Sequence, residues 1–124
     1  MRWIIDAMNV IGTRPDGWWR DRHGAMVNLV DRLERWAAAE GEEVMVVFEH
    51  PPRPPIVSSV IEVTHAKRPG ANSADDEIVR RGRAADDPAS VRVVTSDGGL
   101  TQQVHAAGAS VYPAATFRAQ IDPA

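Results

Sequence analysis

The N-terminal stretch Trp3-Ile4-Ile5-Asp6-Ala7-Met8-Asn9 decides how the rest of the chain is interpreted. Its short apolar run, residues 3–5, is typical of a strand that is buried on both faces, as in a parallel sheet. The run ends on a carboxylate, Asp6, and an amide, Asn9, follows three residues later. Because ligands of parallel α/β sheets bind at the carboxyl ends of the strands, Asp6 stands where a functional site would lie.

Length and composition are those of an ordinary globular protein. The chain has 124 residues, of which 44% are hydrophobic and 25% charged, and this predicts one domain over residues 1–124. There is no cysteine, which excludes disulfides and thiolate metal sites. No apolar run reaches the roughly 18 residues of a membrane span, and a signal-peptide pattern is lacking. A cytoplasmic protein without a membrane partner is therefore expected.

The formal net charge of −3 argues at first sight against a polyanionic partner. The basic residues are nevertheless almost all arginine, 13 of 14, and several of them lie in predicted loops near candidate acids. Since a local basic patch is what binds phosphate, the net charge does not exclude a nucleic acid.

Strand and helix patterns alternate along the chain. Apolar runs predict strands at residues 3–5, 44–48, 57–63, 91–95 and 109–112. Apolar spacings of three and four, with helix start and stop signals, predict helices at about 24–40, 73–83 and 100–107, and one helical turn at 114–119. This alternation predicts right-handed βαβ crossovers and a parallel sheet.

Acidic residues converge on one edge of that sheet. Three predicted strands are followed by Asp6, Glu49 and Asp97, and the helix at 73–83 carries Asp75 and Asp76 in its first turn. Taken singly, acids at a helix start are explained by the helix dipole. Together, they repel one another unless a cation neutralises them. Oxygen ligands suit Mg²⁺ or Mn²⁺ better than Zn²⁺, and such an ion among basic loops is typical of phosphodiester hydrolysis.

The surrounding loops supply candidates for RNA contacts. These candidates are Arg14, Trp18, Arg53, Lys67 and Arg68. Arginine and lysine bind backbone phosphates, and Trp18 or its neighbour Trp19 would stack on a base. The alternative, in which one tryptophan packs on the core and the arginines are merely solvated, stays open at this point.

Four segments occur in a recognisable order. Residues 6–9 read D-A-M-N, a second strand ends on Glu49, residues 73–78 read S-A-D-D-E-I, and residues 95–97 read T-S-D. They resemble the D-x-x-N, T-A-D-x-x-I and T-S-D motifs of NYN-domain proteins, in particular the YacP-like branch of the PIN-like ribonuclease superfamily. Glu49 stands where that family usually carries Asp. The resemblance covers roughly residues 2–112.

The resemblance implies a three-layer α/β/α PIN-like domain with a central parallel sheet of strand order 3-2-1-4-5. It also implies an endoribonuclease that depends on Mg²⁺ or Mn²⁺. The catalytic residues carried over by position are Asp6, Asp75, Asp97, Asn9 and Ser96. The metal ligands would come from Asp6, Asp75, Asp97, Glu49 and Asp76. RNA is the expected partner, together with a homodimer or an association with other RNA-processing proteins.

Two other functions stay open from sequence. A PIN-type toxin of a toxin–antitoxin pair has a similar length and acid layout, although Asn9 and the S-A-D-D segment favour the NYN branch. A non-catalytic RNA-binding or scaffold module would keep the fold and tolerate Glu49. A receiver-like or phosphatase domain fits less well, because the single lysine, Lys67, precedes a helix rather than following a strand.

Overall fold

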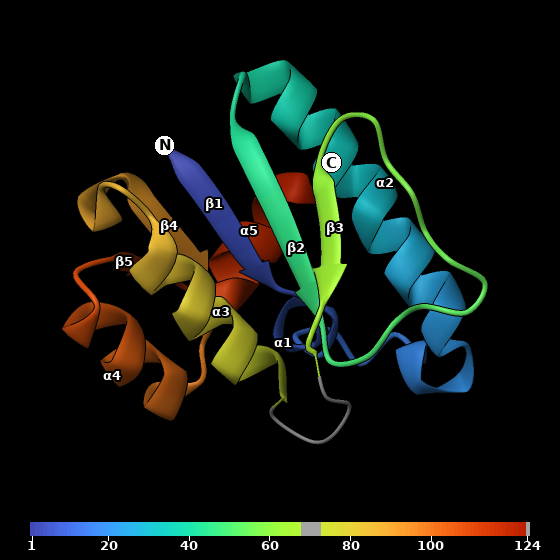
Figure 1. The fold of residues 1–124 in the computed structure, drawn as a ribbon. Helices are drawn as coiled ribbons and strands as arrows, with labels where there is room; N and C mark the ends of the chain where they lie inside the picture. Colours follow the sequence, from blue (N-terminus) through green and yellow to red (C-terminus); the bar gives the residue numbers. More distant parts are fainter. Residues whose placement is uncertain (68–72, 124) are drawn as a thin grey trace.

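The computed structural model describes residues 1–67 and 73–123 and contains one five-stranded sheet. The strands are β1 (Arg2–Asp6), β2 (Glu43–Phe48), β3 (Glu62–His65), β4 (Val91–Val94) and β5 (Ser110–Tyr112). They are all parallel and lie in the order β3-β2-β1-β4-β5 (Figure 1). The predicted parallel sheet and its strand order 3-2-1-4-5 are therefore confirmed. The predicted RNA-contact residue Arg68 lies outside the described residues.

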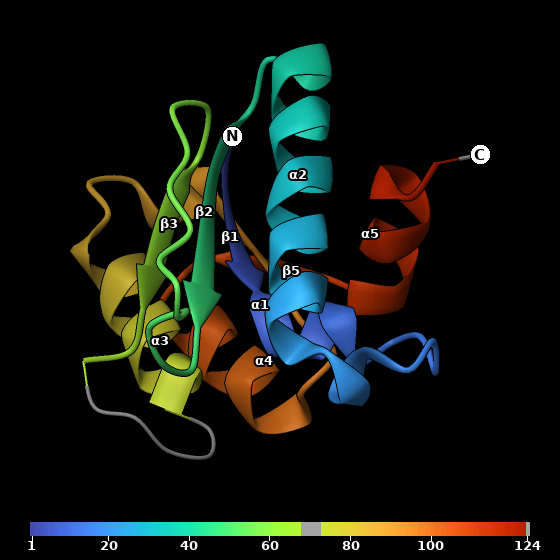
Figure 2. The ribbon, with the colours of Figure 1, turned by 90° about the vertical axis from the view of Figure 1, so that its right-hand side faces the viewer.

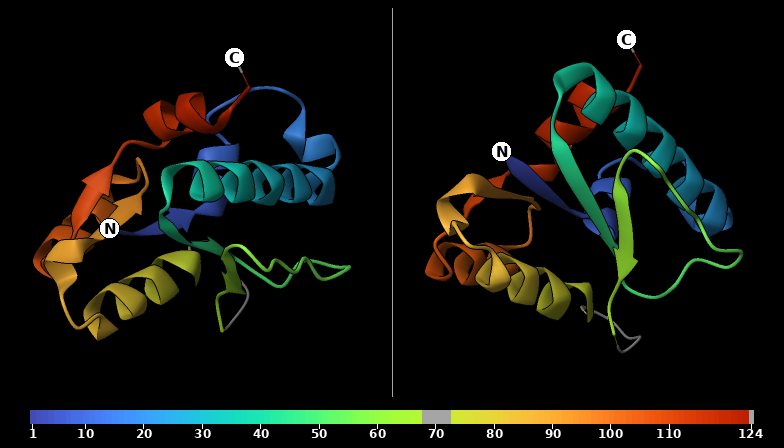
Figure 3. Two further views of the ribbon diagram at one scale, coloured as in Figure 1. Left: turned by 90° about the horizontal axis from the view of Figure 1, so that it is seen from above. Right: turned by 45° about the horizontal axis from the view of Figure 1, so that its top comes forward.

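Helices cover both faces of the sheet. They are α1 (Ala7–Ile11), α2 (Arg22–Glu40), α3 (Ser73–Ala84), α4 (Gly98–Ala106) and α5 (Ala114–Ile121), with short 3-10 helices at Trp18–Arg20 and Pro88–Ser90. Helices α1, α2 and α5 pack on one face and α3 and α4 on the other (Figures 2 and 3). This arrangement is the predicted three-layer α/β/α sandwich.

The core consists of two apolar layers that meet in the central strands. Alternate side chains of β1 point to opposite faces, so Ile5 packs in the α2 layer and Ile4 in the α3 layer, and each is at most 1% exposed. Burial on both faces explains why these strands read as continuous apolar runs rather than as alternating ones. It also fixes the register that brings the strand ends to one edge.

Some element boundaries differ from those that the sequence predicts. The third strand was expected at 57–63 but lies at Glu62–His65, because Ser58 Oγ accepts hydrogen bonds from the backbone N–H groups of Val60 and Ile61 and forms a turn there. Helix α1 has five residues, too few for an apolar periodicity to show. Helix α2 ends as predicted at Gly41, which has a φ of 67°.

No helix within residues 1–67 and 73–123 is long and apolar enough to cross a bilayer.

Candidate functional site

The site begins where β1 and β4 end side by side. In the parallel register Ile5 pairs with Val94, which places the next residues, Asp6 and Thr95, next to each other. Thr95 Oγ1 donates a hydrogen bond of 2.9 Å to Asp6 Oδ2 and accepts one of 3.2 Å from the backbone N–H of Asp97. Thr95 is 1% exposed, so its hydroxyl is a fixed link between two candidate acids.

Asp6 is a buried carboxyl with an unfavourable electrostatic environment. Its side chain belongs to a residue that is 6% exposed. The pKa of Asp6 is raised from 3.8 to about 6, chiefly by burial and also by the negative charges of Asp75, Asp97 and Glu49, while the hydrogen bond from Thr95 acts in the opposite direction. These three acids therefore stand close enough to Asp6 to act on its ionisation.

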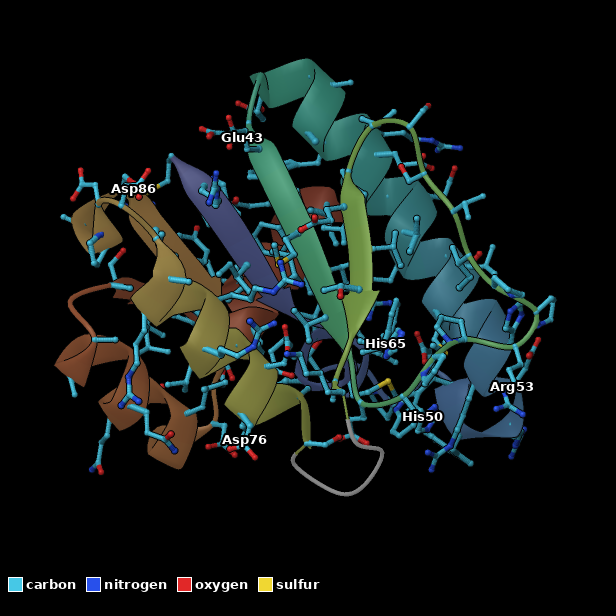
Figure 4. All side chains as sticks on the ribbon, viewed as in Figure 1. Glu43, His50, Arg53, His65, Asp76 and Asp86 are labelled. Atoms are coloured by element: carbon cyan, nitrogen blue, oxygen red, sulfur yellow. The ribbon has the colours of Figure 1, made fainter. Side chains whose placement is uncertain are left out.

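Helix α3 brings the second set of acids to the same edge. Asp75 is half-buried in its first turn, and burial, followed by the charges of Asp97, Asp76 and Glu49, raises the pKa of Asp75. Asp76 is exposed at the same end of α3 (Figure 4). Across residues 1–67 and 73–123 no arginine or lysine forms an ion pair with any of these acids.

The start of α3 is bonded to the end of β2. Ser73 Oγ donates a hydrogen bond of 2.8 Å to the backbone carbonyl of Glu49. This contact holds the strand that carries Glu49 against the helix turn that carries Asp75. Glu49 itself is half-buried directly after β2.

Asp97 has a structural as well as an electrostatic role. Its Oδ1 accepts a hydrogen bond of 2.8 Å from the N–H of Leu100 and so caps α4. The cap engages one carboxylate oxygen, and Oδ2 remains for other contacts. In the same way Thr95 engages Oδ2 of Asp6, and Oδ1 remains.

Asn9 and Ser96 tie three elements together. Asn9 Oδ1 accepts a hydrogen bond of 2.8 Å from the N–H of Ser96, and Ser96 Oγ accepts one of 3.0 Å from the N–H of Ala114. Helix α1, the loop after β4 and the start of α5 are joined through these two side chains. Their oxygens thus fix the shape of the edge on which Asp6 and Asp97 stand.

The carboxylates provide the oxygen ligands that a hard divalent cation uses, but they do not converge on one point. Among the residues that the structure describes, no three acids or histidines stand close enough to hold one ion as the side chains lie. A divalent ion at this edge would need the remaining oxygens of Asp6 and Asp97 and the carboxylate of Asp75 to turn toward one point. Oxygen donors in that number suit Mg²⁺ or Mn²⁺.

The predicted RNA-contact residues are divided between two surroundings. Arg14 forms an ion pair of 3.5 Å with Asp122, which also pairs with Arg32 and Arg118. Trp18 is half-buried against the core, as the simpler alternative held. Arg53 and Lys67 are exposed.

Thr95 is the site residue for which sequence reasoning gave no role. It links Asp6 and Asp97 although 89 positions separate it from Asp6. The available signal was its place, because a threonine that ends an apolar strand beside two strand-end acids is positioned to donate to one of them.

Comparison with known proteins gives relatives of this fold. A family model described as the YacP-like NYN domain matches residues 3–124. Among solved structures, Rae1 (YacP) from Bacillus subtilis aligns at 21% identity and a TM-score of 0.81, covering 98% of this chain and 73% of that chain. A mutant of Rae1 aligns at 22% identity and a TM-score of 0.80, with 97% and 74% covered. At such identities the structures show a shared fold. No curated protein sequence matches the chain.

Proposed function

Since the chain belongs to the YacP-like NYN domain family, we propose that it is a divalent-metal-dependent endoribonuclease that hydrolyses phosphodiester bonds of RNA. The observation that carries the proposal is the electrostatic state of the acidic edge. Burial and the negative charges of Asp97 and Glu49 raise the pKa of both Asp6 and Asp75. Among the residues that the structure describes, no arginine or lysine forms an ion pair with these four acids. Such a group costs folding free energy, and a bound cation offsets the cost.

The acids that would hold Mg²⁺ or Mn²⁺ are Asp6, Asp75 and Asp97, with Glu49 and Asp76 as further ligands. In Asp6 and Asp97 one oxygen is already bonded inside the protein, and the second oxygen is the one that would reach the ion. A divalent ion, when bound, polarises the phosphate, lowers the pKa of an attacking water and stabilises the leaving oxygen.

The chain's own residues orient the acids and accept a proton. Thr95 Oγ1 fixes the Asp6 carboxylate, and the Asn9–Ser96 hydrogen bond fixes the loop on which Asp97 stands. The attacking water would lose its proton to an acid of this edge that does not hold the ion, and its oxygen would form a bond to phosphorus as the bond from phosphorus to the leaving nucleotide's oxygen breaks.

The test is cleavage of a labelled RNA by the purified protein with Mn²⁺, with Mg²⁺ and with EDTA. We expect cleavage with either ion and none with EDTA. Asp6→Asn and Asp97→Asn should each abolish it. Asp86→Asn is the matched control, because Asp86 is an exposed aspartate at the opposite end of the sheet (Figure 4). Cleavage that persists in Asp6→Asn, or that does not need a divalent ion, contradicts the proposal.

A further inference from the structure

A groove is formed between the start of α2 and the loop that follows β2. It has a volume of about 430 Å³ and is lined by Arg22, His23, Met26, His50, Pro51, Pro52 and Arg53. A hydrogen bond of 2.9 Å between His23 Nε2 and the carbonyl of Pro54 joins the two walls. His50 follows Glu49 directly in the chain, so the loop that carries this acid also forms one wall of the groove.

The groove contrasts in charge with most of the surface. Its lining contains two arginines and two histidines and no acid. Glu43 and Asp86 lie at the amino end of the sheet, whereas His50 and Arg53 lie toward the carboxyl end, the end that also carries the acidic edge (Figure 4). The negative net charge of the chain therefore does not describe this part of it.

The interior of the groove is apolar between its basic rims. Met26 and Pro52 are buried in its floor, and Pro51 is half-buried beside them. On the rim, the Arg22 guanidinium lies 5.3 Å from the centre of the Trp18 ring, which holds this charge at the groove. Arg53 is exposed on the facing loop.

We propose that this groove binds one unpaired nucleotide of the RNA strand that is cut at the acidic edge. The inference rests on the proposed function and adds a subsite to it. Arg22 and Arg53 bind the phosphates on either side, and the base lies against Pro51, above the buried Met26 and Pro52. The volume is that of a small-ligand site, which lies in the range of about 300–1,000 Å³. A base inside a duplex is covered by its neighbours and cannot enter, so single-stranded RNA is preferred.

Binding of fluorescent RNA in EDTA tests the groove separately from cleavage. Fluorescence anisotropy would compare a single-stranded oligonucleotide with a blunt duplex of the same sequence. We expect the wild-type protein to prefer the single strand. The double variant Arg22→Glu/Arg53→Glu should bind it at least about tenfold more weakly and lower the slope of log K against log salt by about 1.4, or about 0.7 for each lost phosphate contact.

The matched control reverses two arginines outside the groove. Arg35 on the outer side of α2 and Arg83 near the end of α3 are both exposed, so Arg35→Glu/Arg83→Glu makes the same change in net charge. We expect its affinity to stay within about twofold of wild type once salt reaches physiological strength, because distant surface charges are then screened. Arg22→Gln/Arg53→Gln is a milder second variant and should change affinity in the same direction.

Each outcome decides a different statement. The proposed binding site is contradicted by any of three results: equal losses of affinity in the groove and control variants, no loss in either variant, or equal binding of duplex and single strand. Groove-dependent binding without any Mn²⁺-dependent cleavage by the wild-type protein overturns the proposed function and leaves the binding site. Mn²⁺-dependent cleavage together with binding that does not depend on Arg22 and Arg53 supports the proposed function and contradicts the binding site.

Discussion

Asp6 and Glu77 are two buried carboxylates that the same fold treats in opposite ways. They are 6% and 5% exposed, respectively. Asp6 receives a hydrogen bond from a neutral hydroxyl and faces three other acids. Glu77 receives hydrogen bonds from the guanidinium groups of Arg80 and Arg81, its neighbours on α3. Similar burial is thus combined with opposite electrostatics.

The ionisation of the two groups follows from these surroundings. Burial raises the pKa of Asp6 to about 6, and its acidic neighbours add to the effect. Burial also acts to raise the pKa of Glu77, but the hydrogen bonds and charges of Arg80 and Arg81 outweigh it and lower the pKa below 4.5. A carboxylate with its own cations is a structural element. One that is buried among like charges is unfavourable for folding, which makes it a candidate for function.

The two acids therefore give stability opposite dependences on pH. Between pH 3.8 and about 6 folded Asp6 holds its proton while the unfolded chain releases it, so stability falls as pH rises through this window. Glu77 has a lowered pKa, so its contribution is complete above pH 4.5 and is lost as pH falls toward its folded value.

The largest expected effect comes from removing the charge of Asp6. Asp6→Asn should lower RNA cleavage by at least about 100-fold, since even partners of metal ligands contribute about 10–100-fold. The same change should raise the free energy of unfolding at pH 7.5 by about 2–3 kcal/mol, because a shift of about two pKa units corresponds to about 3 kcal/mol. Urea unfolding at pH 4 and pH 7.5 checks the sign. Lower stability at pH 7.5 would show that Asp6 is a structural acid like Glu77.

Thr95 offers a smaller change at the same acid. Thr95→Val removes the hydrogen bond that lowers the pKa of Asp6, so this pKa should rise. We expect about a tenfold loss of cleavage near pH 6 and a smaller loss at pH 8, where Asp6 is ionised in either protein. The measurement is kcat/KM against pH, and Thr95→Ser should restore the wild-type profile. A loss that is equal at all pH values would mean that Thr95 serves packing alone.

Glu77 is the structural half of the comparison. Glu77→Gln should lower the free energy of unfolding by about 1 kcal/mol, because three charge-assisted hydrogen bonds weaken while the partly exposed arginines regain water. Cleavage should stay within about twofold of wild type, since both carboxylate oxygens of Glu77 are engaged by Arg80 and Arg81. Chemical denaturation and the cleavage assay on one preparation check both parts. A strong loss of cleavage in a folded variant would join Glu77 to the site.

The sequence predicts what is local and periodic. Residues 3–5 and 44–48 appear as strands because both of their faces are buried, and parallel strands bring Asp6 and Glu49 to one edge without further information. The position of β3 differs from the predicted one. Residues 57–63 have the composition of a strand, but the turn at Ser58 takes the place of strand pairing there. Helix α1 was missed because five residues carry no period.

Contacts between distant positions account for what the sequence left open at the site. The hydrogen bond from Thr95 to Asp6 and the ion pair from Arg14 to Asp122 depend on folded geometry, and no pattern within one segment encodes them. The first adds a positioning residue to the predicted acids. The second gives Arg14 an intramolecular partner, while its contact with RNA stays a prediction.

The smallest expected effect separates the two arginines that neutralise Glu77. Arg81 has a side-chain exposure of 32% against 47% for Arg80, and it also lies 4.0 Å from Glu62. Arg81→Ala should therefore destabilise the protein by about 0.5 kcal/mol and Arg80→Ala by less, because exposed ion pairs contribute little and one arginine still neutralises the acid in each variant. Denaturation midpoints at pH 7 and pH 4 measure both. The double variant should lose more than the sum, since it leaves Glu77 buried without a cation, which is the situation of Asp6. A merely additive loss would show that removing the second cation carries no extra cost, and that charge pairing is not what distinguishes Glu77 from Asp6.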